Sequence, residues 1–140
     1  MSGRYQRLRE TADGMGERKD CSVIATAIVL DKDYQEVRQE FLRQGRKPNR
    51  STNFSITQLV LFRYGMQATN IPAPAKTLVT LGRLGMQGRY LVRVSRHIAA
   101  MVDSVIHDWT QGRRHRIQFF YVVEPYGTKG TYEKALGYKG

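Results

Sequence analysis

Hydrophobic positions divide the chain into an N-terminal half with helical patterns and a C-terminal half with strand patterns. Residues 21–30 (CSVIATAIVL) are apolar on nearly every side, which is typical of a buried helix. Asp20 precedes this run at a good N-cap position. The sequence therefore predicts that a buried helix begins at Cys21.

Residues 34–43 carry a single inward stripe, formed by Tyr34, Val37 and Phe41. Asp33 and Glu36 make a capping-box pattern at the start of this segment, which predicts a second helix.

Further along, Ser55 and Gln58 make another capping box, which predicts a short helix through Tyr64. The stretch NIPAPAK, residues 70–76, is typical of a turn and linker. We expect one more short helix over residues 76–84.

From Gly88 the pattern changes to short runs of strand type. RYLVRVS alternates between polar and apolar residues, and HIAAMV and VIHDW flank the dipeptide Asp103-Ser104, which predicts a hairpin turn. A final strand is expected from Ile117 to Val123, with Pro125 ending it. The predicted fold class is α+β, with an N-terminal helical half packed on a C-terminal antiparallel sheet.

Length and composition suit one domain. The 140 residues are enough for a single core. We expect a flexible basic arm over 1–19, the folded domain over 20–124, and a mobile tail rich in glycine and lysine over 125–140. No apolar run approaches the ~20 residues of a membrane span, and the first residues are polar. The sequence thus predicts a cytoplasmic protein with no membrane partner.

Cysteine chemistry is limited to one residue. A single thiol excludes an internal disulfide and a cysteine-based zinc site, so we expect no metal and no cofactor. Cys21 nevertheless stands where the predicted buried helix begins. The positive end of a helix stabilises a thiolate, and its free N–H groups can bind an oxyanion. The alternative is a cysteine that only fills space.

The predicted hairpin turn sorts the histidines by strand face. With a two-residue turn at Asp103-Ser104, Ala99 lies opposite Asp108, so His97 is a diagonal neighbour of Asp108 on the same face. His107 points to the opposite face. We therefore predict His97 as the base that takes the thiol proton and Asp108 as the group that orients it. Trp109 is placed to shield their hydrogen bond from water. The alternative is an ordinary exposed hairpin.

These segments resemble a known family. The run DCSVIATAIVLDKDYQEV, followed by GRYLVRVSRHIAAMVDSVIHDW, is similar to papain-like cysteine peptidases, in particular to compact bacteriophage versions and bacteriocin-processing peptidases. The resemblance covers roughly residues 17–124. It implies a papain-like fold, a Cys21–His97–Asp108 triad, and a phage-encoded thiol protease acting on a protein or peptide in the host cytoplasm.

The chain departs from that family just before the cysteine. Papain-like enzymes usually have a glutamine there that donates to the oxyanion, whereas this chain reads MGERKD. The candidates for lining the site or replacing that donor are Lys19, Asp20 and Trp109. A backbone N–H group is a further alternative, ahead of Arg18.

The high positive charge of the chain suggests a second possible function, the binding of an anionic partner. The net charge is +11, which favours an anionic partner such as an acidic protein or nucleic acid. Two clusters supply the candidate anion-binding residues: Arg43, Arg46, Lys47 and Arg50, and then Arg113, Arg114 and Arg116 around His115. No helix-turn-helix, zinc-finger or glycine-rich phosphate-loop pattern accompanies them. Two functions thus stand open: a thiol hydrolase (cysteine peptidase or amidase), or a papain-like binding module without strong activity that engages a host macromolecule through its basic surface.

Overall fold

Helices come first along the chain and an antiparallel sheet follows, in a computed structural model that describes residues 2–127. The helices are α1 (Gly3–Gly14), α2 (Cys21–Leu30), α3 (Tyr34–Arg43), α4 (Phe54–Arg63) and α5 (Leu78–Leu81). The strands are β1 (Met66–Ile71), β2 (Arg89–Val94), β3 (His97–Val102), β4 (Val105–His107) and β5 (Phe119–Pro125). They form one sheet in the order β1-β5-β2-β3-β4, with every neighbouring pair antiparallel. The predicted α+β class is confirmed.

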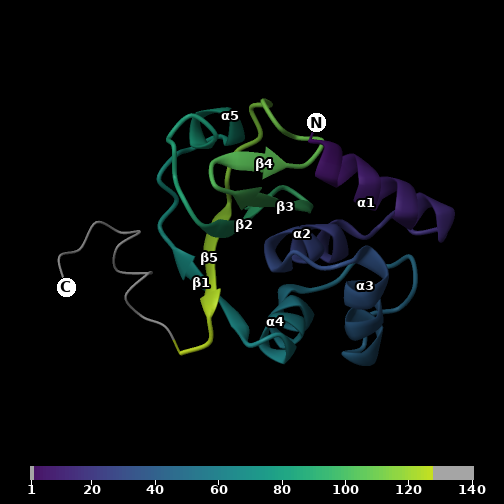
Figure 1. The fold of residues 1–140 in the computed structure, drawn as a ribbon. Helices are drawn as coiled ribbons and strands as arrows, with labels where there is room; N and C mark the ends of the chain where they lie inside the picture. Colours follow the sequence, from purple (N-terminus) through teal and green to yellow (C-terminus); the bar gives the residue numbers. More distant parts are fainter. Residues whose placement is uncertain (1, 128–140) are drawn as a thin grey trace.

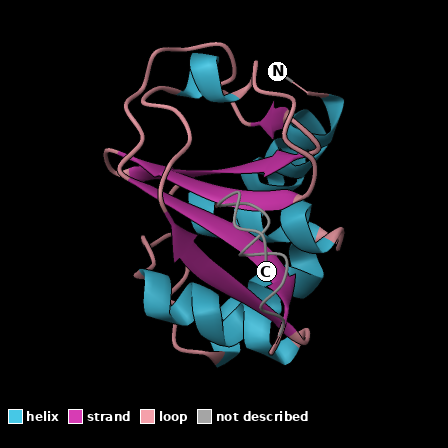
Figure 2. Ribbon diagram, turned by 90° about the vertical axis from the view of Figure 1, so that its left-hand side faces the viewer, coloured by secondary structure: helices cyan, strands magenta, loops and turns pink. Residues whose placement is uncertain are grey.

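The apolar helix α2 lies at the centre of the molecule. It is flanked by α1, α3 and α4 on one side and by the sheet on the other (Figure 1). Its residues from Ser22 to Leu30 are all buried, which explains why the segment is apolar all round. The opposite face of the sheet buries a second apolar cluster beneath α5. Figure 2 shows the twisted sheet running between these two layers.

The N-terminal segment differs from the predicted arm. Residues 3–14 form α1, whose Tyr5 and Ala12 are buried against the central core. Ser2 caps the helix by accepting the Tyr5 backbone N–H. The prediction of a flexible arm is wrong here. The segment is mostly polar and charged, so its few buried residues do not form a recognisable apolar stripe.

Several element boundaries also differ. The strand β1 begins directly after α4, where no strand was predicted, and it pairs with β5. Helix α5 is shorter than the predicted 76–84. The cap of α4 is Asn53, which accepts the Ile56 N–H, and not Ser55. Residues 128–140 of the predicted tail lie outside the described residues, and Pro125 is the last residue of β5.

The hairpin that organises the histidines is confirmed. Val102 pairs with Val105, Met101 with Ile106 and Ala100 with His107, as the two-residue turn requires. Asp103 and Ser104 both have positive φ, at 48° and 74°. Two positive φ values are the signature of the tight turn that matches the twist of a hairpin. Within the described residues, no helix has the length and apolar character needed to cross a membrane.

Candidate active site

The start of α2 meets β3 where the sheet edge is open. The pairing of β4 with β3 ends at His107 opposite Ala100, so residues 97–99 extend beyond their neighbour. The Cys21 thiol occupies this position. It lies within hydrogen-bonding reach of the His97 ring and of the Ile98 backbone N–H.

His97 is fixed from its other side by Asp108. Its Nε2 lies 2.7 Å from Asp108 Oδ2, and the Asp108 side chain is almost completely buried. Thr110 holds the same carboxylate oxygen by donating its hydroxyl at 2.6 Å and its backbone N–H at 3.1 Å. Because Nε2 is engaged by Asp108, Nδ1 is the ring nitrogen left for the thiol. The structure therefore brings together the three residues that the sequence singled out.

The electrostatics of the three groups favour a charge-separated pair. Burial alone would raise the pKa of the Cys21 thiol, but the bonds to His97 and to the Ile98 N–H outweigh it and leave that pKa below its usual value. Burial likewise works against a charged His97, yet Asp108 and Cys21 together raise the pKa of His97 to about 9. Both shifts act in the same direction, toward a thiolate beside an imidazolium.

Trp109 covers the outer side of the histidine. Its ring centroid lies 5.2 Å from that of His97, and the side chain is half-exposed. The Arg113 guanidinium lies 5.6 Å from the Trp109 ring centroid, and His115 meets the same ring edge-on at 5.4 Å. The indole is thus in the position predicted for a shield over the His97–Asp108 bond.

His107 is separate from this constellation. Its Nδ1 lies 2.8 Å from the Ser2 hydroxyl at the start of α1. Burial lowers the pKa of His107, helped by nearby Arg4, so the ring is neutral at pH 7. The face assignment predicted from the hairpin holds for both histidines.

Asp20 lines the smaller of two hollows beside Cys21, but it is not a hydrogen-bond donor there. Its buried carboxylate accepts from Arg9 Nη1 of α1 at 2.7 Å and from the Tyr34 hydroxyl of α3 at 2.7 Å. It makes no side-chain cap to α2. A carboxylate engaged in this way cannot donate to an oxyanion, so Asp20 instead ties α1 and α3 to the residue before Cys21. Sequence analysis missed Arg9 and Tyr34 because their partner is distant in the chain.

A second buried carboxylate holds the loop beside the cysteine. Glu17 accepts from Arg46 Nη2 at 2.6 Å, from Arg38 Nε at 3.1 Å and from the Asn49 backbone N–H. Asn49 in turn accepts the Arg18 backbone N–H at 2.9 Å. Arg46 is only 4% exposed, which corrects its assignment as an anion-binding residue. The motif MGERKD thus turns Glu17 and Asp20 inward, and leaves Arg18 and Lys19 exposed.

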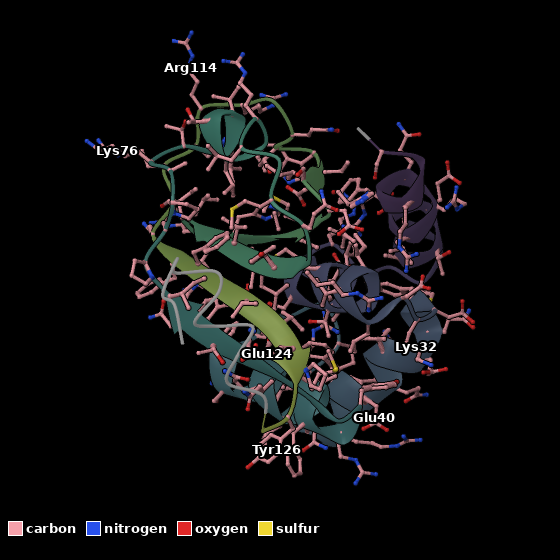
Figure 3. All side chains as sticks on the ribbon, turned by 60° about the vertical axis from the view of Figure 1, so that its left-hand side comes forward. Lys32, Glu40, Lys76, Arg114, Glu124 and Tyr126 are labelled. Atoms are coloured by element: carbon pink, nitrogen blue, oxygen red, sulfur yellow. The ribbon has the colours of Figure 1, made fainter. Side chains whose placement is uncertain are left out.

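The remaining anion-binding candidates lie at the surface. Arg43 is bonded to Glu40 but is mostly exposed. The side chains of Lys47, Arg50, Arg113, Arg114 and Arg116 are exposed as well. Arg114 projects outward at the end of the molecule that carries α5, as does Lys76 (Figure 3).

Two hollows adjoin the thiol and together make a cleft. The smaller, of about 240 Å³, is bounded by Arg18, Lys19, Asp20 and Trp109 among others. The larger, of about 450 Å³, runs from the start of α4 to the turn between β2 and β3. Both are lined by Cys21, Ser51, Arg96 and His97, so the catalytic candidates lie between them. A further hollow of about 530 Å³ beside α1 and α3 contains neither a thiol nor an imidazole.

Within residues 2–127, no three or more His, Cys, Asp or Glu side chains gather as a metal site would require. Comparison with known protein families, with curated proteins and with solved structures found no match for this chain. The case for function therefore stands on the geometry of the site.

Proposed function

We propose that this protein is a thiol hydrolase, a cysteine peptidase or amidase, that cleaves an amide bond in a protein or peptide. The observation that carries the proposal is the continuous contact from the Cys21 thiol to the His97 ring and on to the buried Asp108 carboxylate. We further propose that the helices and five-stranded sheet are a compact papain-like fold, on the resemblance of the segments around these three residues.

The chemistry follows from the charges on the pair. The Cys21 thiolate attacks the carbonyl carbon of the substrate, and the imidazolium of His97 gives its proton to the departing amine as the C–N bond breaks. Water then attacks the thioester while His97 takes a proton from it, and the C–S bond breaks to release the carboxylic acid and restore the thiolate beside the imidazolium. Asp108 holds the ring in place and stabilises its positive form throughout.

The first turn of α2 is the proposed oxyanion site. The N–H groups at a helix start have no partner within the helix, and Asp20 does not cap them. The Cys21 N–H, beside the sulfur, is the primary donor. The exposed Lys19 lines the same hollow and takes the place of the missing glutamine as the second donor.

A structural role explains the cysteine less well. A buried thiol that only fills space has no need of a helix start, a histidine and a backbone N–H around it, since burial favours its neutral form. A reactive thiolate needs all three.

The test is digestion of a randomised peptide library, read by mass spectrometry, together with labelling of Cys21 by iodoacetamide at pH 6.5. We expect cleavage and fast labelling by the wild type, and neither by Cys21→Ala. The Cys21→Ser variant tests the thiol itself, because it keeps the shape of the residue. Slow labelling, at the rate of glutathione, together with no cleavage would overturn the proposal.

The second candidate function is a binding module on the same scaffold. It is favoured by the MGERKD motif, where the expected amide donor is replaced by residues that turn inward or into solvent. In that case Cys21→Ala would leave binding to an anionic macromolecule unchanged, and no peptide would be cleaved.

A further inference from the structure

Positive charge in the cleft is unbalanced. Arg18 and Lys19 line the smaller hollow, Arg93 lines the larger one, and Arg96 lines both. Among the residues that the structure describes, no carboxylate lies within 4.0 Å of any of these four cations. Arg9, the other cation of the cleft, is neutralised by Asp20 and Asp13.

The carboxylates of the cleft are already engaged. Asp20 is bonded to Arg9 and Tyr34, and Asp108 to His97 and Thr110. The larger hollow is lined by no carboxylate at all within the described part of the chain. Its positive potential is thus available to something outside the protein.

The larger hollow has the form of a site for an acidic side chain. The Phe54 ring and Ile98 supply apolar wall, while Arg93 and Arg96 supply charge. The Arg93 guanidinium is steadied over the Phe119 ring, 5.3 Å from its centroid. Thr52 lines the same hollow, and its buried hydroxyl has no hydrogen-bond partner among the described residues.

The backbone at Arg96 supports a role for its side chain. Arg96 has a φ of 57° in the two-residue turn that joins Val94 to His97. Glycine is preferred in such a conformation because it has no β-carbon to be strained, and asparagine because its short side chain can hydrogen-bond to the nearby backbone. Arginine at this position pairs with no carboxylate inside the described protein, yet lies next to His97.

We propose that the cleft selects peptides with an acidic side chain beside the scissile bond, whose carboxylate binds between Arg93 and Arg96. This inference rests on the proposed function, which places an amide carbonyl at Cys21. Two guanidinium groups in a hollow with a partly apolar wall suit a carboxylate on a short aliphatic stem, as in glutamate. Arg96 and Arg93 are then specificity-determining residues.

The first test compares two reagents that differ in charge. Iodoacetate is an anion and iodoacetamide is neutral, and both alkylate Cys21. We expect the iodoacetate-to-iodoacetamide rate ratio to exceed that of glutathione by about tenfold, because local cations concentrate an anion. Arg96→Asn, which tolerates the positive φ, should lower the ratio at least threefold, as should Arg93→Gln.

The matched control is Lys76→Gln. It removes one exposed cation that points away at the α5 end (Figure 3), and it should leave the ratio unchanged. Thermal unfolding accompanies each variant, and Arg96→Asn should unfold at the same or a higher temperature. A ratio equal to that of glutathione, or equal in Arg96→Asn and wild type, would overturn the proposal.

The second test uses peptides. A blocked peptide containing glutamate should protect Cys21 from iodoacetamide, and the matched glutamine peptide should protect at least fivefold less well. A stronger protection by oligothymidylate than by the glutamate peptide would overturn the peptide proposal in favour of a nucleic acid. Failure of the hydrolase proposal is distinguishable, since it leaves library peptides uncleaved whatever the reagent ratio is.

Discussion

At the scale of the residue, the bond between His97 and Asp108 governs the state of Cys21. Asp108 raises the pKa of His97, and the His97 ring in turn lowers the pKa of the Cys21 thiol. Thr110 matters because it holds the Asp108 oxygen that faces His97. The reactivity of the thiol therefore depends on Asp108, which contacts His97 and not the sulfur itself.

The first prediction separates the two ionisations by pH. The thiolate is lost as pH falls through the lowered pKa of Cys21, so alkylation by iodoacetamide should decline toward acid. The imidazolium is lost as pH rises through the His97 pKa of about 9. Peptide hydrolysis needs that proton for the leaving amine and should fall above pH 9, whereas alkylation should not. A fall in both rates above pH 9 would contradict this assignment.

The second prediction ranks substitutions within the site. His97→Ala removes the acid and base and should lower kcat/KM by about 10²–10⁴. Asp108→Asn should cost less, because it only weakens the orientation and charge of the ring. His107→Ala is the control, since that ring contacts Ser2 on the other face and should change kcat/KM little. Activity that depends on His107 and not on His97 would refute the assignment.

At the scale of the element, buried ion pairs place the start of α2. Glu17 ties the loop before Cys21 to α3 and to residues 46–49, and Asp20 ties it to α1 and α3. Of the residues in these contacts, Arg9 and Asp20 also line the smaller hollow of the cleft, as does Ser51.

The third prediction contrasts two cations of one cluster. Arg46 is buried against Glu17, so Arg46→Ala leaves a buried carboxylate short of a partner and should lower the free energy of unfolding by about 3–5 kcal/mol. Lys47 is exposed, and Lys47→Ala should change it by less than about 1 kcal/mol. Urea unfolding at pH 7 measures both. Equal effects would mean that Arg46 is a surface residue after all.

The fourth prediction concerns α1. Removing residues 1–14 uncovers the core that Tyr5 and Ala12 close, and it deprives Asp20 of Arg9. Truncated protein should unfold at a markedly lower temperature, and iodoacetamide should label its Cys21 more slowly at pH 6.5. A truncated form that keeps the wild-type melting temperature would restore the interpretation of this segment as a loose arm.

At the scale of the whole molecule, a large excess of positive charge remains after the internal ion pairs are taken into account. The net charge is +11, and Arg46, Arg38 and Arg9 are tied to internal carboxylates. Cations without an internal carboxylate include those along the cleft and those on the loop that carries Arg113, Arg114 and Arg116.

The fifth prediction follows from that surface. The protein should bind heparin at low salt and elute as salt rises, because each phosphate- or sulfate-like contact releases counterions. Replacing Arg114 and Arg116 together by glutamine should lower the elution salt without changing peptide cleavage by more than about threefold. Passage through the column at 50 mM salt would show that the charge is only solvated.

The sequence by itself determined the features that depend on near neighbours. The apolar run predicts the buried helix that begins at Cys21, and the dipeptide Asp103-Ser104 predicts the hairpin register. Strand alternation then pairs His97 with Asp108 and turns His107 away. These features follow from fixed helical and strand periodicities, so distant contacts do not alter them.

Only the tertiary structure decided the features that depend on distant partners. Helix α1 has few apolar residues, and its structural role is evident only from the packing of Tyr5 and Ala12 against the core. From the sequence, Arg46 is predicted to be a surface cation. The structure shows it buried in an ion pair with Glu17, which is distant in the sequence. The contact of Cys21 with β3 was likewise decided by packing, because the open edge beyond β4 exists only once the sheet has formed. These contacts join residues that are far apart in the sequence, and the local pattern of polar and apolar residues holds no information about them.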